Sequence, residues 1–227
     1  MLFSIIMPVL NEEAVLEYHL SNLVRQISHS NCELLIVDGG STDRTIEIAQ
    51  RFGNVISSRR GRAAQMNSGA GIAKGEVLLF LHADTLLPDD AFRVIEHALK
   101  AHEVVGGAFR ICFNCDKWPY QLVAFTTNLR SRIYKIFTGD QAYFVRSVSF
   151  RAIGGFPDQP LMEDLEIITR LRKIGSVVLL PQYVTTSARR HERNGLVRSV
   201  LFMWYLRTLY TLGTSPTKLQ RMYIDVR

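Results

Sequence analysis

Apolar and polar positions follow two different periods along the first hundred residues. Continuous apolar runs predict buried strands in FSIIMPV (3–9), ELLIVDGG (33–40) and EVLLFLHA (76–83). Between them, apolar residues recur every three or four positions and predict helices over 12–27, 41–52 and 61–75. Ser41 and Thr42 are the candidate N-caps of the second helix. Strands and helices that alternate in this way predict an α/β fold, with a mostly parallel central sheet and helices on both faces.

The second half is less regular. It predicts strands over 106–114 and 139–147, one or two strands over 176–187, and a long helix over 118–137. A further helix is expected over 160–175, with Pro160 early and Gly175 at its end. The last helix, 196–210, is apolar nearly all the way round.

Composition indicates one large globular domain. The chain has 227 residues, of which 47% are apolar and 21% charged, enough for a substantial core. The first residues read as a strand and not as a signal peptide, and no uncharged apolar run reaches the roughly 18 residues of a transmembrane helix. The three cysteines are few and odd in number, which favours a reducing compartment and therefore a cytoplasmic protein.

The positive charge is concentrated near the C-terminus. Segment 189–227 carries eight Lys and Arg residues and two acids, an excess that equals the net charge of +6 of the whole chain. This segment either faces an anionic partner or is a solvated tail.

Polar residues gather where the three predicted strands end, in 8–13, 38–43 and 82–84. Ligands of open α/β sheets bind at the C-terminal ends of the strands, so these segments are expected to form one site. Asp84 follows a buried strand and is suited to hold Mg²⁺ or Mn²⁺ on a diphosphate. The alternative is that Asp84 caps the next helix. His82 is either a metal ligand or a packed neighbour of the site.

Two more motifs allow both structural and functional interpretations. DGGSTDRT (38–45) forms either a turn with a helix cap or a ligand loop, in which Asp38 accepts a hydrogen bond from a base or ribose. Arg62, near a helix N-terminus, is suited to phosphate. Glu163 and Asp164 either complement the dipole of a helix or provide a general base for a hydroxyl.

The motifs taken together resemble a known family. SIIMPVLNEE, DGGSTDRT, GRAAQMNSG, GEVLLFLHADT, GGFPDQPLMEDLEI and SARRHERNG, in this order, are similar to family 2 glycosyltransferases of GT-A fold. The similarity covers nearly the whole chain and is strongest to a short bacterial subgroup with HAD at the metal-binding position. It implies an inverting, hexosyltransferase-type enzyme that moves a sugar from a nucleoside-diphosphate sugar, with a UDP-sugar favoured, to a hydroxyl acceptor.

The resemblance also implies roles for individual residues. Asp164 is the expected catalytic base, with Glu163 beside it, and Asp84 and His82 are the expected metal site for Mn²⁺ or Mg²⁺. The residues expected to bind the nucleotide are Pro8, Asn11, Glu12, Asp38, Arg62, Ala83, Arg189 and Arg190. The sequence departs from the family twice: His82 replaces an aspartate, so metal dependence could be weak, and Arg189-Arg190-His191 lacks the usual Trp.

These roles divide the single domain 1–227 into three parts. Residues 1–103 are the expected nucleotide-sugar-binding half, 104–188 the acceptor and catalytic half, and 189–227 a basic, apolar C-terminal helix and tail. That helix either contacts an anionic membrane or a lipid-linked acceptor, or covers the core or a homodimer interface. No nucleic-acid partner is expected. The alternatives are a non-catalytic module that binds a membrane or a nucleotide sugar and, less favoured, a sugar-1-phosphate nucleotidyltransferase.

Overall fold

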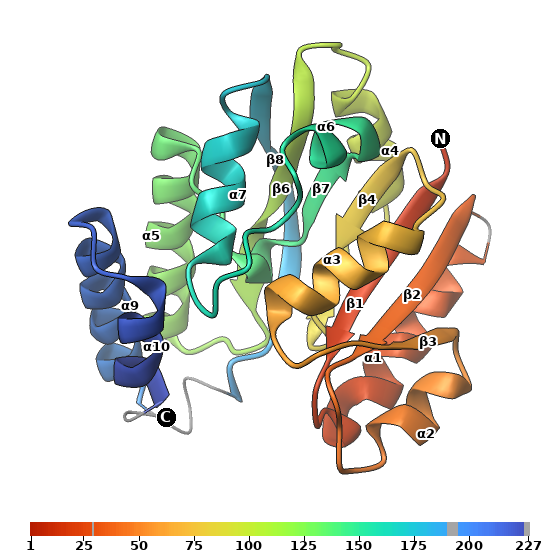
Figure 1. Ribbon diagram of the computed structural model, residues 1–227, viewed down its shortest axis with the longest axis horizontal. Helices are drawn as coiled ribbons and strands as arrows, with labels where there is room; N and C mark the ends of the chain where they lie inside the picture. The colour runs from red at the N-terminus through yellow and green to blue at the C-terminus, as the bar shows by residue number, and fades with distance from the viewer. Residues whose placement is uncertain (29, 190–194, 225–227) are drawn as a thin grey trace.

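The computed structural model describes residues 1–28, 30–189 and 195–224 (Figure 1). A central sheet has helices on both faces, so the predicted α/β class is confirmed. The strands are β1 (Phe3–Val9), β2 (Cys32–Asp38), β3 (Asn54–Ser57), β4 (Val77–Phe80), β5 (Thr85–Leu86), β6 (Val104–Phe113), β7 (Tyr143–Arg146) and β8 (Ser176–Thr186). The helices are α1 (Glu13–Ile27), α2 (Thr45–Gln50), α3 (Arg62–Ile72), α4 (Ala91–Ala98), α5 (Trp118–Tyr134), α6 (Ser147–Ala152), α7 (Glu163–Leu171), α9 (Leu196–Thr211) and α10 (Pro216–Ile224), with a 3₁₀ turn η1 (Gly139–Gln141).

The strand order is β3-β2-β1-β4-β7-β6-β8-β5. Strands β1 to β4 are mutually parallel, as predicted, whereas β7 is antiparallel to both β4 and β6. Val9 at the end of β1 pairs with Asp38 at the end of β2. The first strands therefore deliver their following loops to the same edge of the sheet.

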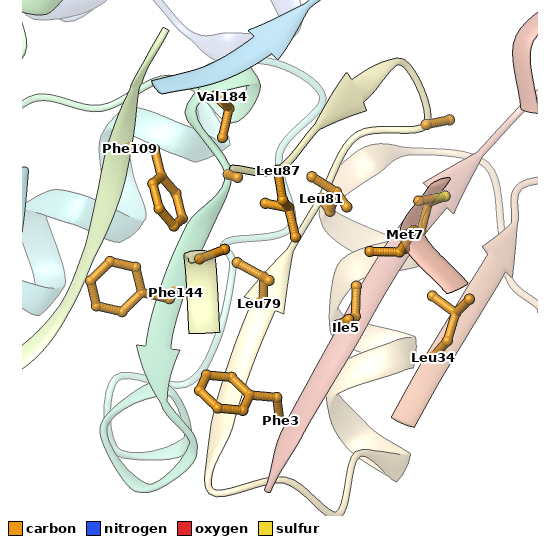
Figure 2. Close-up of a cluster of buried hydrophobic side chains, with 14 of the residues drawn as sticks. Phe3, Ile5, Met7, Leu34, Leu79, Leu81, Leu87, Phe109, Phe144 and Val184 are labelled. Carbon is orange, nitrogen blue, oxygen red and sulfur yellow. The ribbon is translucent and has the colours of Figure 1, made fainter. Parts of the chain in front are cut away.

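Side-chain alternation along β1 divides the core between the two faces of the sheet. Phe3, Ile5 and Met7 are buried in one apolar cluster, which Figure 2 shows, while Ile6 is buried in the cluster on the opposite face. Both faces of β1 are buried, and the one buried polar side chain among residues 3–7, Ser4, has hydrogen-bond partners in Glu33 and the backbone N–H of Gly75. The protein thereby gains the rigid sheet on which the loops are mounted.

Small residues let α3 lie close to the sheet. A Cβ on Gly69 would lie 2.6 Å from Ile6 Cγ2 and 3.0 Å from Val37 Cγ2, so the helix could not approach as closely with alanine there. This packing also fixes the N-terminus of α3, with Arg62, relative to the strand ends.

Several predicted helix boundaries are wrong. Helix α2 begins at Thr45, with Arg44 at the N-cap position, so Ser41 and Thr42 are not its caps. Helix α7 begins at Glu163, after Pro160, and ends at Leu171, before Gly175. Strands β3 and β5 and helices α6 and α10 were not predicted. Each is short or lacks a clear apolar period, and tertiary contacts decide such elements.

Candidate active site at the strand ends

The loops after β1 and β2 are joined by hydrogen bonds. Asn11 donates its backbone N–H to Ser41 Oγ (3.0 Å) and accepts the backbone N–H of Thr42 on its side-chain oxygen (2.8 Å). Asn11 holds a positive φ of 54°, a conformation that asparagine tolerates better than most residues. Ser41 and Thr42 therefore shape the site loop, which is why they are unavailable as helix caps.

Asp38 lies at the centre of this arrangement and is 3% exposed. Its carboxylate accepts the backbone N–H groups of Gly40 (2.8 Å) and Ser41 (3.1 Å), so it organises the loop that follows β2. Gln65 of α3 donates its side-chain amide to the carbonyls of Val9 and Val37, both at 2.8 Å. The strand ends, the loop and α3 thus form one connected framework.

Asp84 does not cap a helix. Strand β5 begins at the next residue and α4 only at Ala91, with Asp90 at the N-cap position, so this alternative is wrong. His82 and Asp84 are both partly exposed, whereas Ala83 between them is buried. A Cβ on Gly139 would lie 2.8 Å from His82 Nε2, which places His82 against η1 of the second half.

Glu12, in the loop after β1, lies within electrostatic range of Asp84. Burial raises the pKa of Glu12, and the negative charge of Asp84 raises it further, while Arg189 opposes both effects. Arg189 Nη2 lies 3.5 Å from Glu12 Oε2 and forms an ion pair with it. Pro8 is partly buried in β1. Arg190, which the sequence also assigns to the nucleotide, lies outside the described residues.

The carboxylate oxygens of Asp84 and Glu12 suit a hard cation that takes most of its ligands from a substrate. Within residues 1–28, 30–189 and 195–224, no group of three or more His, Cys, Asp or Glu side chains could hold a metal ion alone. Asp84 offers a carboxylate, and Glu12 is close enough for the two negative charges to repel each other. Mg²⁺ and Mn²⁺ are commonly held by one or two carboxylates and substrate phosphates, so the residues fit such an ion.

Glu163 and Asp164 open α7 on the other side of the site. Burial raises the pKa of Glu163 to about 7, and Asp164 adds to the effect. Burial also raises the pKa of Asp164, although Arg207 and Arg62 lower it. The residue before them, Met162, is buried at a positive φ of 65°. Such strained backbone persists only when its surroundings hold it in place.

The C-terminal helices supply that support. Met162 packs in a small apolar cluster with Leu206 of α9 and Leu219 of α10. Of the two alternatives for the C-terminal helix, contact with a membrane or acceptor and cover for the core or a dimer interface, the structure shows that one face packs on a small apolar cluster separate from the two clusters at the sheet. Its contact is with the segment that positions the two carboxylates, so α9 and α10 are part of the site's framework.

Arg62 connects the two halves of the site. It is exposed at the first position of α3, next to Gly61 with a φ of 132°. Its positive charge lowers the pKa of three carboxylates, namely Glu12 of the first loop and both Glu163 and Asp164 of α7. Arg62 therefore lies within electrostatic range of the strand ends and of α7 together.

Sequence reasoning missed four polar residues of this region. Arg130 of α5 and Arg207 of α9 lie within electrostatic range of Asp164, and so does Asp140 of η1. His19 of α1 has a pKa lowered by burial and is influenced by Asp84 and Arg189. None of these four lies in a motif or at a predicted strand end, so only the tertiary structure could identify them.

A comparison with protein-family models matches residues 4–154 to glycosyl transferase family 2. This match covers most of the chain, including the framework around Asp38, Arg62 and Asp84. The chain belongs to glycosyl transferase family 2. The family expected from the motifs is therefore confirmed.

Two curated relatives illustrate the similarity. The PGL/p-HBAD biosynthesis glycosyltransferase of Mycobacterium bovis is 43% identical over 94 residues, 38% of this chain and 36% of the relative. The undecaprenyl-phosphate 4-deoxy-4-formamido-L-arabinose transferase of Aeromonas hydrophila is 31% identical over 118 residues, 46% of this chain and 36% of the relative. The matches thus span about a third of the length of these relatives.

Solved structures share the fold of this family 2 glycosyltransferase. Mannosyltransferase PcManGT from Pyrobaculum calidifontis, in complex with GDP-Man and Mn²⁺, has a TM-score of 0.67 and 21% identity, and the match covers 95% of this chain and 66% of that one. S. aureus TarS 1–349 in complex with UDP-GlcNAc has a TM-score of 0.66 and 22% identity, with 82% and 58% covered.

Proposed function

We propose that this family 2 glycosyltransferase moves a sugar from a nucleoside-diphosphate sugar to a hydroxyl acceptor, with inversion at the anomeric carbon. The observation that carries the proposal is the position of Arg62, within electrostatic range of both the strand-end loops and the carboxylate pair of α7. A diphosphate bound at Arg62 would lie within electrostatic range of the carboxylates of α7, and a single displacement requires the leaving group and the base to be held around one reacting carbon.

The chemistry assigned to α7 follows from its burial. Asp164 is the base that accepts the proton of the acceptor hydroxyl, whose oxygen then bonds to the anomeric carbon as the bond to the diphosphate oxygen breaks. Burial raises the pKa of Asp164, which makes it a better proton acceptor than an exposed carboxylate, while Arg62 and Arg207 keep it from rising further. Glu163, beside it, is the second carboxylate of the catalytic pair.

The nucleotide is assigned to the first half. Asp38 and the loop that it organises would contact the base or ribose, with Pro8, Asn11 and Ala83 around it. Arg62 and Arg189 would contact the diphosphate, and Asp84 would hold Mn²⁺ or Mg²⁺ with His82 beside it. When bound, the ion would neutralise charge on the departing diphosphate. The PcManGT and TarS complexes, which hold GDP-Man and UDP-GlcNAc, support a nucleotide-sugar donor. Among such donors, the resemblance of the motifs favours a UDP-sugar.

The acceptor is assigned to the second half, 104–188, and a lipid-linked hydroxyl compound is the favoured class. The name of the A. hydrophila relative, an undecaprenyl-phosphate transferase, supports this class. In the described parts of the chain, no helix is long and apolar enough to cross a membrane. The lipid-linked class of acceptor supports peripheral contact with a membrane. The cytoplasmic location and the homodimer stay predictions from the sequence.

Calorimetric titration tests the donor site. UDP and then GDP are titrated into the wild type, Asp84→Asn and Asp164→Asn, with and without Mn²⁺. We expect Mn²⁺-dependent binding in the wild type, loss of that dependence in Asp84→Asn and normal binding in Asp164→Asn. Turnover of the bound nucleotide sugar should be lost in Asp164→Asn, because the proton acceptor is gone.

Two results would contradict parts of this proposal. Normal turnover by Asp164→Asn would remove the assignment of the base, and binding indifferent to both Mn²⁺ and Asp84→Asn would remove the metal site. The absence of nucleotide binding in every variant would favour the alternative, a non-catalytic module that binds an anionic partner through its basic C-terminal segment.

A further inference from the structure

Helix α5 exposes an apolar stripe to solvent. Its residues recur every three or four positions along one side of the helix and are between 42% and 72% exposed: Trp118, Leu122, Phe125, Leu129 and Ile133. Single exposed apolar residues are ordinary on protein surfaces, whereas a continuous stripe of five indicates a contact surface.

Helix α9 has a second stripe. Its inner side packs Phe202, Leu206 and Leu209 into the small cluster that supports Met162. Its outer side leaves five large apolar residues at least half exposed, counting the one at its C-terminal cap: Val197, Leu201, Trp204, Tyr205 and Leu212. The apolar character all round the helix therefore has two causes, a packed face and an unpartnered one.

The two helices lie side by side at the edge of the molecule (Figure 1). Between them is a groove with a volume of about 330 Å³, lined by Leu129, Ile133 and Tyr134 of α5 and by Trp204 of α9. Because residues of both stripes line the same groove, we define the two stripes and this groove as the α5/α9 surface.

A partly buried cation lies at the wall of this groove. Arg130 lines it, and its Nε and Nη2 atoms are buried without a hydrogen-bond partner in the described part of the chain. Neither Arg130 nor Arg207 forms an ion pair among those residues, although both lie within electrostatic range of Asp164. Buried guanidinium donors are costly to leave unpaired, so this position suits an anionic ligand group.

The charged residues of α5, α9 and α10 indicate an anionic partner. The sequences of α5, α9 and α10 contain six Arg and Lys residues and no Asp or Glu: Arg130, Arg132, Arg198, Arg207, Lys218 and Arg221. Exposed apolar stripes on helices whose own charged residues are all positive are typical of helices that lie in the interface of an anionic membrane.

We propose that the α5/α9 surface docks on an anionic phospholipid membrane, with the groove receiving a lipid whose phosphate contacts Arg130 and whose apolar chain lies along the stripes. Arg130 lines the groove and lies within electrostatic range of Asp164, so a membrane-borne acceptor held there would have its head group near that carboxylate. This last step rests on the proposed transferase function, whereas the docking itself does not.

The same features argue against other occupants. A second copy of the chain seated on this surface would bring two sets of helices together that each carry four arginines, with no acid on α5 or α9 to compensate them. Nucleic acid would complement the charge but would leave the large apolar residues of both stripes in water.

Vesicle sedimentation tests the proposal with a matched pair of variants. Val197→Asp changes a 69% exposed valine of the stripe on α9, and Val148→Asp changes a 71% exposed valine of α6, which is outside the surface. The vesicles contain phosphatidylcholine and phosphatidylglycerol in equal parts. Val197→Asp should reduce the partition coefficient about tenfold or more, because the free energy of burying one valine side chain corresponds to at least a tenfold change in affinity. Val148→Asp should sediment like the wild type.

A second pair tests the groove. Arg130→Gln removes the buried guanidinium, and Arg132→Gln removes an exposed one from the same helix. Preference for phosphatidylglycerol-containing vesicles over phosphatidylcholine alone should fall more in Arg130→Gln. Circular dichroism and UDP titration on each variant show whether fold and donor site are retained.

Equal sedimentation of Val197→Asp and Val148→Asp, or a wild type that binds UDP but no vesicles, would overturn the docking surface. A dimer in solution that Val197→Asp dissociates would replace the membrane by a second copy. Equal effects of the two arginine variants would overturn the role of the groove. A wild type that binds vesicles but no nucleotide would overturn the proposed transferase function and leave the docking surface standing.

Discussion

Replacing Glu163 with glutamine should make the protein more stable at neutral and alkaline pH. Glu163 is 7% exposed at the start of α7, beside Asp164, and burial raises its pKa from 4.5 to about 7. Glutamine has nearly the same shape and stays neutral at every pH. The variant therefore removes the cost of placing a negative charge in this position without creating a cavity.

The magnitude follows from the pKa. Between pH 4.5 and about 7 the unfolded chain loses the proton of Glu163 while the folded protein keeps it, so the stability of the wild type falls as the pH rises. Each pH unit in this window costs about 1.4 kcal/mol, which gives on the order of 3 kcal/mol in total. Above the window both states are ionised and the deficit stays constant.

Urea denaturation at about pH 5 and about pH 8 measures this difference. The free energies of unfolding of the wild type and Glu163→Gln should be similar at the lower pH, and the variant should be more stable by most of this amount at the higher pH. Glu166→Gln is the control, since Glu166 lies in the same turn but is partly exposed and ion-paired with Arg170. A wild type and Glu163→Gln with parallel pH profiles would refute the argument that Glu163 is held in a charge-excluding environment.

Two further predictions concern the framework of the site, and denaturant midpoints measure both. Gly69→Ala should destabilise the protein by about 1–3 kcal/mol, because the new Cβ would lie 2.6 Å from Ile6. Gly71→Ala should stabilise it by up to about 1 kcal/mol, because no atom lies within 4 Å of its new Cβ. Equal effects of the two substitutions would contradict the close packing of α3. Gln65→Leu should cost about 1–3 kcal/mol through the lost hydrogen bonds to the carbonyls of Val9 and Val37, and an unchanged midpoint would show that these bonds do not hold the strand ends.

The stabilising effect expected of Glu163→Gln is itself informative about function. A buried carboxylate pair lowers the stability of the fold, and Met162 before it has a strained backbone. Features that cost stability in this way concentrate at functional sites, where the chemistry requires them. The pair at the start of α7 has the stability cost that accompanies the proposed proton-transfer role, and that role stays a prediction.

The sequence alone determined the class of fold and the family. Continuous apolar runs identified β1, β2 and β4, and the amphipathic period identified α1, because local periodicity records which faces are buried. The rule that ligands bind at strand ends then placed Asp38 and Asp84 at one edge, and the pairing of Val9 with Asp38 agrees with it for the first two strands. These features depend on neighbours close in the chain.

The tertiary structure decided what depends on distant contacts. Ser41 and Thr42 looked like helix caps because their own sequence favours that role, but Asn11, thirty residues away, binds both. Arg130 and Arg207 lie in no motif and come near Asp164 only because α5 and α9 pack beside α7. The even apolar pattern of α9 could not show which face is covered, since hydrophobicity alone does not distinguish burial by protein from exposure to a partner. Only the tertiary structure shows which face of α9 packs against protein and which face is exposed.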